Sequence, residues 1–247
     1  MKAFILAAGL GTRLRPLTDS IPKALIKING IPLLEIIIKR LIKFGFNEII
    51  INVHHLAEQI IDFIEKNKFD AEIFISDERN LLLDTGGGLK KASSFFDDGT
   101  SFLIHNVDIL SDINLIDFYE YHKKQNAIAT IAVQKRNSSR YFLFDNENNL
   151  CGWKNSKTSE AKIVRTPSSQ LNEYAFSGIH VVNPDIFKYF PNDDVFSIID
   201  FYLAVAVEKR ITFYDHSKNF FFDLGKKENL QQAEIFLSSS NFLKELR

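Results

Sequence analysis

The first half of the chain alternates short apolar runs with longer stretches in which apolar residues recur at helical spacing. The short runs are rich in β-branched residues and span Ala3–Ala7, Glu48–Asn52, Ala71–Ser76 and Phe102–Asn106. The stretches at helical spacing span Pro32–Phe44, Leu56–Asn67, Gly87–Phe95 and Leu115–Gln125. This alternation predicts βαβ units around a mostly parallel sheet.

The second half is richer in predicted strands and less regular. We expect strands at Ala127–Val133, Tyr141–Phe144, Leu150–Trp153, Tyr174–Val182, Ile211–Tyr214 and Phe220–Asp223, with helices at Ile198–Glu208 and near Glu228–Ser238. The polar stretch Asn155–Asn172 has little periodicity, and we expect a loop or lid there. Because no linker rich in Pro, Gly or Ser separates the halves, we expect one domain over residues 1–247, with halves of about 1–112 and 113–247.

Composition and charge exclude several classes of protein. A chain of 247 residues with 45% hydrophobic content can bury a sizeable core, which excludes a disordered or fibrous protein. The formal charge of −1 provides no global field for nucleic acid or an anionic membrane. The single cysteine, Cys151, cannot form an internal disulfide, and no apolar run approaches the roughly 18 residues that span a bilayer. We expect a soluble cytoplasmic protein that binds neither nucleic acid nor membranes.

A glycine-rich loop follows the first predicted strand and contains Gly9 and Gly11. The free backbone N–H groups of such a loop suit phosphates, and the nearby Arg13, Arg15 and Lys23 add fixed positive charge. A dinucleotide fingerprint would require glycine in place of Leu14, and the Gly-Lys-Ser/Thr of a P-loop is absent. The alternative is a tight turn with solvated basic side chains.

Two aspartates that follow apolar runs are candidate metal ligands. Asp108 comes just after the predicted strand Phe102–Asn106, and Asp223 ends the run that begins at Phe220. Magnesium commonly takes one or two protein carboxylates together with phosphate oxygens and water. Either aspartate alone could serve a turn or cap a helix, but two beside a phosphate-binding loop favour a magnesium site.

Three consecutive glycines, Gly86–Gly88, follow Asp84 and Thr85. This run exceeds what an ordinary turn requires, and it suggests that a flat ligand such as a nucleobase approaches the backbone closely. A structural turn is the alternative.

The string from Leu6 to Leu25, LAAGLGTRLRPLTDSIPKAL, resembles the signature of the sugar-phosphate nucleotidyltransferases, the pyrophosphorylases that make NDP-sugars. Segments of that family similar to N-G-D, V-D-V-G-T, D/E-T-G-G-G and F-S-G-I occur around Asp108, Asp223, Gly86 and Ser177. The resemblance implies a three-layer, mostly parallel Rossmann-like (glycosyltransferase A-like) sheet. Helices would cover both faces, with a nucleotide-binding first half and a small β-rich sugar-binding lobe in the second.

The same resemblance implies roles for individual residues. Arg13, Lys23 and Asp108 would be catalytic, and Asp108 and Asp223 would hold Mg²⁺. The implied nucleotide-binding residues are Leu6, Ala7, Ala8, Gly9, Gly11, Thr12, Arg13, Lys23, Thr85, Gly86 and Gly87. The implied sugar-phosphate-binding residues are Asn106, Ser177 and Gly178.

The substrates that the resemblance implies are an NTP and a sugar 1-phosphate, joined to an NDP-sugar with release of pyrophosphate. The glycine segment and the short chain are similar to the N-acetylmuramate 1-phosphate uridylyltransferase-like branch, so UTP with N-acetylmuramate 1-phosphate is the first expectation. The alternatives are guanylyl transfer to mannose or another hexose or heptose 1-phosphate, and phosphocholine cytidylyl transfer. A catalytically silent nucleotide-sensing subunit is the non-enzymatic alternative, but the presence of Arg13, Lys23, Asp108 and Asp223 favours an enzyme.

Two residues depart from the family pattern, and one segment is absent. Val107 stands where the family usually has glycine, and Lys226 stands where threonine is common. The E-K-P segment that related thymidylyltransferases use for the sugar is missing from 141–172. The acceptor is therefore the least constrained part of the expectation.

Overall fold

The computed structural model describes residues 1–246, and the chain divides into two compact units. Unit 1 contains Met1–Leu82, His105–Leu115 and the residues from Phe220 onward. Unit 2 contains Leu83–Ile104 and Ile116–Asn219. Both units are therefore assembled from segments distant in sequence, and each is described by itself.

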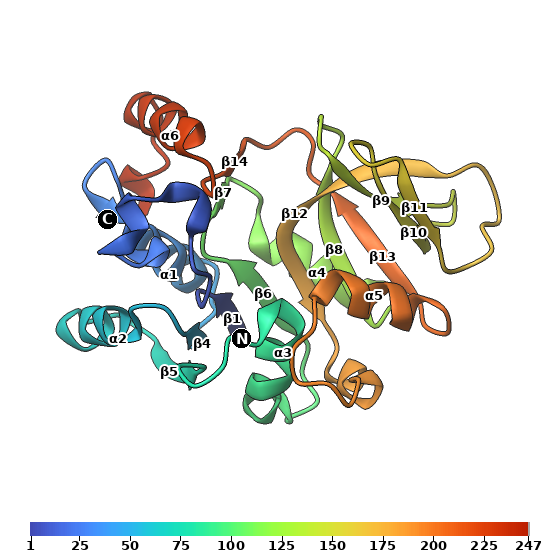
Figure 1. The fold of residues 1–247 in the computed structure, drawn as a ribbon, viewed down its shortest axis with the longest axis horizontal. Coiled ribbons are helices and arrows are strands. Elements are labelled where there is room, and N and C mark those ends of the chain that lie inside the picture. The colour runs from blue at the N-terminus through green and yellow to red at the C-terminus, as the bar shows by residue number, and fades with distance from the viewer. Residues whose placement is uncertain (247) are drawn as a thin grey trace. The chain divides into compact units, whose positions relative to one another are not determined.

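Unit 1 is built on parallel strands β1 (Lys2–Leu6), β4 (Glu48–Val53) and β5 (Glu72–Asp77), which lie side by side (Figure 1). Strand β1 pairs with β4 from Lys2 opposite Glu48 to Leu6 opposite Asn52, and β4 continues the register into β5. Strand β6 (Phe102–Asn106) runs from unit 2 into unit 1. The parallel sheet predicted from the alternating pattern is confirmed.

Helices α1 (Leu33–Lys43) and α2 (Ala57–Lys66) connect these strands along the chain. The buried face of α1 consists mostly of leucine and isoleucine, and the strand residues Phe4, Ile5 and Ile51 have no exposed surface. Each such side chain contributes roughly 1.5–3 kcal/mol when it is removed from water. Burial of apolar residues on strands and helix thus holds the sheet that carries the loop after β1.

Two short antiparallel pairings and one helix complete unit 1 in ways that periodicity did not predict in full. Strand β2 (Lys27–Ile28) pairs with β3 (Ile31–Pro32), and β7 (Ile109–Ser111) pairs with β14 (Phe221–Asp223). Helix α6 spans Lys227–Ser239. Short 3-10 turns lie at Thr12–Leu14, Leu17–Asp19, Lys23–Leu25 and Lys244–Leu246.

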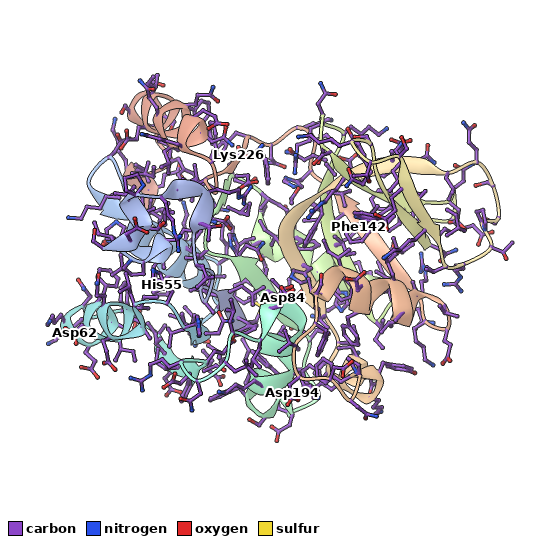
Figure 2. All side chains as sticks on the ribbon, viewed as in Figure 1. His55, Asp62, Asp84, Phe142, Asp194 and Lys226 are labelled. Atoms are coloured by element: carbon purple, nitrogen blue, oxygen red, sulfur yellow. The ribbon has the colours of Figure 1, made fainter. Side chains whose placement is uncertain are left out.

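Unit 2 contains a mainly antiparallel sheet centred on the long strand β12 (Asn172–Val182) (Figure 1). Strand β12 pairs with β8 and β9, β13 runs parallel to β8, and β10 lies between β9 and β11. The bounds are β8 Ala129–Gln134, β9 Arg140–Phe144, β10 Leu150–Asn155, β11 Glu160–Ile163 and β13 Ile211–Asp215. Phe142, labelled in Figure 2, is only 1% exposed and belongs to the core of this sheet.

The helices of unit 2 are α3 (Asp84–Ala92), most of α4 (Leu115–Lys124) and α5 (Ile198–Ala206). Further 3-10 turns lie at Ser93–Phe96 and Pro184–Tyr189. None of the helices described between residues 1 and 246 is long and apolar enough to cross a membrane.

The predicted elements agree with the structure within a few residues, with two corrections. The stretch Asn155–Asn172 is not wholly a loop, because β11 pairs with β10 through backbone hydrogen bonds that leave its own side chains exposed. Helix α3 begins at Asp84, three residues before the predicted start at Gly87, so all three glycines Gly86–Gly88 lie inside its first turns. A single domain over residues 1–247 stays a prediction.

We expect His105 to make unit 1 sensitive to mild acid. His105 is 2% exposed, and burial, reinforced by the charge of Arg40, lowers its pKa from 6.5 to about 3. The unfolded chain therefore binds the proton more readily than the folded chain, so the stabilisation present above pH 6.5 is lost as the pH falls toward 3. Between pH 7 and pH 5 this loss should amount to about 2 kcal/mol in the free energy of unfolding.

Urea unfolding of the wild type and of His105→Gln at both pH values measures this difference. The variant should lose less stability than the wild type on acidification. An equal loss in both proteins would show that protonation of His105 is not responsible.

Candidate functional site

The loop after β1 is closed by a contact between Gly11 and Thr18. Gly11 has a φ of 63°, and a Cβ there would lie 2.7 Å from the Thr18 methyl group. The Thr18 hydroxyl, which is buried, donates to the carbonyl of Gly11 at 2.9 Å. His55, labelled in Figure 2, bonds through Nε2 to the carbonyl of Thr18 at 2.9 Å. The loop therefore has a defined path, and Gly9, Thr12 and Arg13 lie on its exposed part.

Arg13, Asp108 and Asp223 converge on Gly225. A Cβ built on Gly225 would lie 2.5 Å from Arg13 Nη2, 2.9 Å from Asp223 Oδ1 and 3.1 Å from Asp108 Oδ2. All four residues belong to unit 1. Two carboxylates and a guanidinium thus surround one small volume that only glycine leaves open.

Lys23 joins this group through an ion pair with Asp108. The Lys23 ammonium Nζ contacts Asp108 Oδ2, and the two side chains are 13% and 14% exposed. With Arg13 and Asp223, the site therefore contains two cations and two carboxylates whose formal charges cancel. The four residues that the sequence marked for catalysis and metal binding are brought together in one unit.

Backbone pairing places the two aspartates next to each other. Strand β7 begins directly after Asp108, and Asp223, at the end of β14, is paired with Ile109. Beyond the strands, the N–H of Leu224 donates to the carbonyl of Asp108 at 2.8 Å. The side chain of Asn229 donates to the carbonyl of Asp223 at 2.6 Å and secures the end of β14.

The donor set fits a magnesium ion that a phosphate ligand helps to coordinate. Within residues 1–246, no group of three or more His, Cys, Asp and Glu side chains could hold a metal ion by itself. Two converging carboxylates leave the remaining positions to phosphate oxygens and water, which is how magnesium is usually held. Asp108 and Asp223 are the residues that would hold it.

The remaining residues predicted around the loop have varied surroundings. Ala7 and Ala8 are each 5% exposed, and their N–H groups donate to the Asn52 side chain. The carbonyl of Leu6 accepts the N–H of Val107 at 3.1 Å. Ala7 and Ala8 can therefore present their carbonyl groups to a ligand, but their N–H groups are already donated to Asn52.

The β6 end of the site contains Asn106 and Val107. Asn106 is half-buried, and its carbonyl bonds to His105 Nδ1 at 2.8 Å. Val107 is 4% exposed, so its side chain packs inside unit 1. The isopropyl group that replaces the family glycine is accommodated by the core.

The triple glycine lies in unit 2 and has a packing role there. A Cβ on Gly86 would overlap the ring of Phe196, and one on Gly87 would overlap the carbonyl of Asp194. The N–H groups of Gly86 and Gly87 donate to the carbonyl of Phe196 at 2.9 and 3.2 Å, and the Thr85 hydroxyl accepts the N–H of Ile198. Figure 2 shows Asp194 beside α3. At Gly86 and Gly87 the close approach is made by the chain itself, and contact of the triple glycine with a nucleobase stays a prediction.

The predicted sugar-phosphate residues of unit 2 lie at an irregularity of β12. The register with β8 shifts between Phe176 and His180, and Gly178 has a φ of 68°. Ser177 has no exposed surface, and its hydroxyl bonds to Nε2 of the buried His216 at 2.7 Å. A contact between Ser177 and a sugar stays a prediction, and the structure gives this side chain a partner within unit 2.

The sequence did not single out Gly225 or Asn52. Gly225 follows Asp223 by two residues in the segment Asp-Leu-Gly, and its closeness to the metal candidate was the available signal. Asn52 is a polar residue at the end of an apolar strand run, which was the only signal for its contact with the loop.

A phosphate-suited loop with an arginine, a lysine and two carboxylates beside a parallel sheet defines a nucleotide-binding α/β protein. The chain matches the nucleotidyl transferase family over residues 2–240, and it belongs to that family. Membership covers almost the whole chain, so both units are included.

Named relatives agree with this assignment. The chain is 32% identical to UTP–glucose-1-phosphate uridylyltransferase of Synechocystis over 94% of this chain, and it spans 62% of the length of that relative. It is 29% identical to N-acetylmuramate alpha-1-phosphate uridylyltransferase of Neisseria meningitidis, covering 95% of this chain and 97% of the relative. The fold matches UDP-glucose pyrophosphorylase of Acinetobacter baumannii with a TM-score of 0.76 at 17% identity, covering 99% and 96% of the two chains.

We expect Gly225→Ala to weaken binding of nucleoside triphosphates roughly tenfold or more, which corresponds to about 1.4 kcal/mol. The added methyl group would displace the Arg13 guanidinium and press on both carboxylates. Isothermal titration with ATP, CTP, GTP and UTP in the presence of magnesium measures the loss. Lys227→Ala, an exposed position two residues further on, is the matched control and should bind as the wild type does. Unchanged binding by Gly225→Ala would mean that the volume around Gly225 does not receive the phosphates.

Proposed function

We propose that the protein transfers a nucleoside monophosphate from an NTP to a sugar 1-phosphate and releases pyrophosphate. The observation that carries this proposal is the convergence of Arg13, Asp108 and Asp223 on Gly225, with Lys23 on Asp108. Family membership supports the class of reaction. The named relatives supply the class of acceptor.

The chemistry requires positioning more than a protein nucleophile. A sugar phosphate is mostly dianionic at neutral pH, because its second pKa is about 6. One of its oxygens attacks the α-phosphorus of the NTP, and the bond from that phosphorus to the bridging oxygen breaks, so that the electron pair leaves with pyrophosphate. No proton has to be removed from the attacking group, and catalysis depends on alignment and charge stabilisation.

Each charged residue has a distinct part in this proposal. Arg13, exposed at the tip of the loop, binds the β- and γ-phosphates and stabilises the departing pyrophosphate. Lys23, held by Asp108, stands where it can neutralise charge at the reacting phosphorus. Magnesium bound by Asp108 and Asp223 would supply further positive charge to the phosphates.

For the substrates, we infer UTP and N-acetylmuramate 1-phosphate. The support is the Neisseria relative, which is 29% identical to this chain over 95% of its residues. The run Asp84-Thr85-Gly86-Gly87-Gly88 favours the same branch of the family.

A matrix of substrates tests this proposal directly. ATP, CTP, GTP and UTP are each combined with N-acetylmuramate, glucose, mannose and heptose 1-phosphates and with phosphocholine, and pyrophosphate release is measured. We expect the highest kcat/KM for UTP with N-acetylmuramate 1-phosphate. A higher value for another pair would replace the substrate assignment, and no release from any pair would overturn the proposed reaction.

Substitution of the charged site residues should remove turnover without unfolding the protein. Loss of one transition-state contact typically lowers the rate by about 10²–10³, and we expect this for Arg13→Ala, Asp108→Ala and Asp223→Ala with the best substrate pair. Asp62→Ala is the control, because Asp62 lies exposed on α2 and pairs only with Lys66 among the contacts described (Figure 2). Circular dichroism checks the fold, and near wild-type turnover in all three variants would contradict the assigned roles.

A further inference from the structure

Strand β1 leaves the sheet at Leu6, and the next two backbone N–H groups lose the partners that a strand would provide. Ala7 and Ala8 are nevertheless each 5% exposed, so their donors need a replacement. The side-chain carbonyl of Asn52 accepts both N–H groups, at 2.6 Å from Ala7 and 3.2 Å from Ala8. Because Leu6 is paired with Asn52 in the sheet, this side chain stands directly at the point where the loop begins.

Glu78 determines which way the Asn52 amide faces. The Asn52 Nδ2 donates to Glu78 Oε1 at 2.7 Å. A backbone N–H can only donate and a carboxylate can only accept, so one orientation of the amide satisfies both neighbours. Glu78 is therefore a partner that keeps the Asn52 carbonyl pointed at the loop.

The backbone of Glu78 is itself fixed at the end of β5. Its N–H donates to the carbonyl of Val53 at 2.8 Å, and its carbonyl bonds to His54 Nδ1 at 2.7 Å. Glu78 is 1% exposed and Asn52 is 2% exposed. A polar amide and a carboxylate are costly to bury, while the neighbouring positions Ile51 and Val53 are apolar.

We propose that Asn52 and Glu78 are positioning residues that hold the Ala7–Ala8 backbone in the conformation from which the loop presents Arg13 to the NTP phosphates. The inference rests on the proposed function, because that function requires the loop to bind the NTP phosphates. Neither side chain touches the substrate. The pair acts through the backbone of the two alanines and lowers the cost of ordering the loop when the nucleotide binds.

Exchange of the amide and the carboxylate between the two positions tests this pair. Asn52→Asp keeps an acceptor for Ala7 and Ala8 but places two acceptor oxygens against each other. Glu78→Gln keeps an acceptor for the Asn52 amide, so it should be mild. In the double variant, the new glutamine amide can donate to the new aspartate, which restores the pattern of donors and acceptors.

The first measurement is the Kd for each of the magnesium complexes of ATP, CTP, GTP and UTP at pH 8. For the complex that the wild type binds best, Asn52→Asp should raise the Kd roughly tenfold, the effect of losing a hydrogen bond to a charged group. Glu78→Gln and the double variant should stay within about threefold of the wild type. KM for the NTP should follow the Kd, while the KM for the sugar phosphate should not change.

The second measurement is amide hydrogen exchange in peptides that cover residues 4–14. This measurement does not depend on nucleotide binding. Asn52→Asp should exchange roughly tenfold faster there than the wild type, and the double variant should recover protection. Peptides from α1 should exchange equally in all variants. If Asn52→Asp does not fold, Glu78→Leu replaces it, because that change leaves the Asn52 amide free to rotate.

The outcomes separate this inference from the proposed function. A wild type that binds none of the four NTPs overturns the proposed function, and the exchange data still decide whether the pair holds the loop. Wild-type Kd and exchange in Asn52→Asp overturn the inference. A lower melting temperature with unchanged Kd and KM shows a merely structural role and also overturns it, and so does a double variant no better than Asn52→Asp.

Discussion

The antiparallel pairing of β7 with β14 brings Asp108 and Asp223 together across more than a hundred residues of chain, and the rest of the site depends on it. Each strand has only three residues, so the pairing contributes few hydrogen bonds. Additional bonds support it at both ends: Asp112 accepts the N–H of Phe220, and Asn229 donates to the carbonyl of Asp223. Backbone pairing therefore secures the position of both aspartates, while their carboxylates contact the Lys23 ammonium and the N–H of Gly225.

Glycine serves the two units in the same physical way. At Gly225 the missing side chain leaves room for a guanidinium and two carboxylates. At Gly86 it leaves room for the Phe196 ring, and at Gly87 for the backbone carbonyl of Asp194. None of these three positions has a left-handed backbone, so close approach is the reason for the residue. A glycine run therefore indicates that another group approaches the backbone closely, but it does not indicate whether that group belongs to the chain or to a ligand.

Much of the fold followed from local patterns, because the apolar strands and helices of the first half bury their faces at regular periods. The sequence also singled out Arg13, Lys23, Asp108 and Asp223, and the structure brings them together, while their roles toward phosphate and metal stay predictions. Local patterns missed what depends on distant partners. Strand β11 carries exposed side chains and exists through pairing with β10, and Asn52 acquires its partners only when β1, β4 and β5 align.

The cancellation of charge between Lys23, Arg13 and the two aspartates has a consequence for the order of events. A site whose own charges cancel attracts a single cation or a single anion only weakly. The cation competes with Lys23 and Arg13 for the carboxylates, and the anion competes with the carboxylates for Lys23 and Arg13. A cation and a phosphate that arrive together would replace the Lys23–Asp108 ion pair with contacts of their own, so each would improve the affinity for the other by the same factor. The site would then bind the metal–nucleotide complex as a single ligand. Free magnesium or free phosphate would bind too weakly to separate the site's own opposite charges.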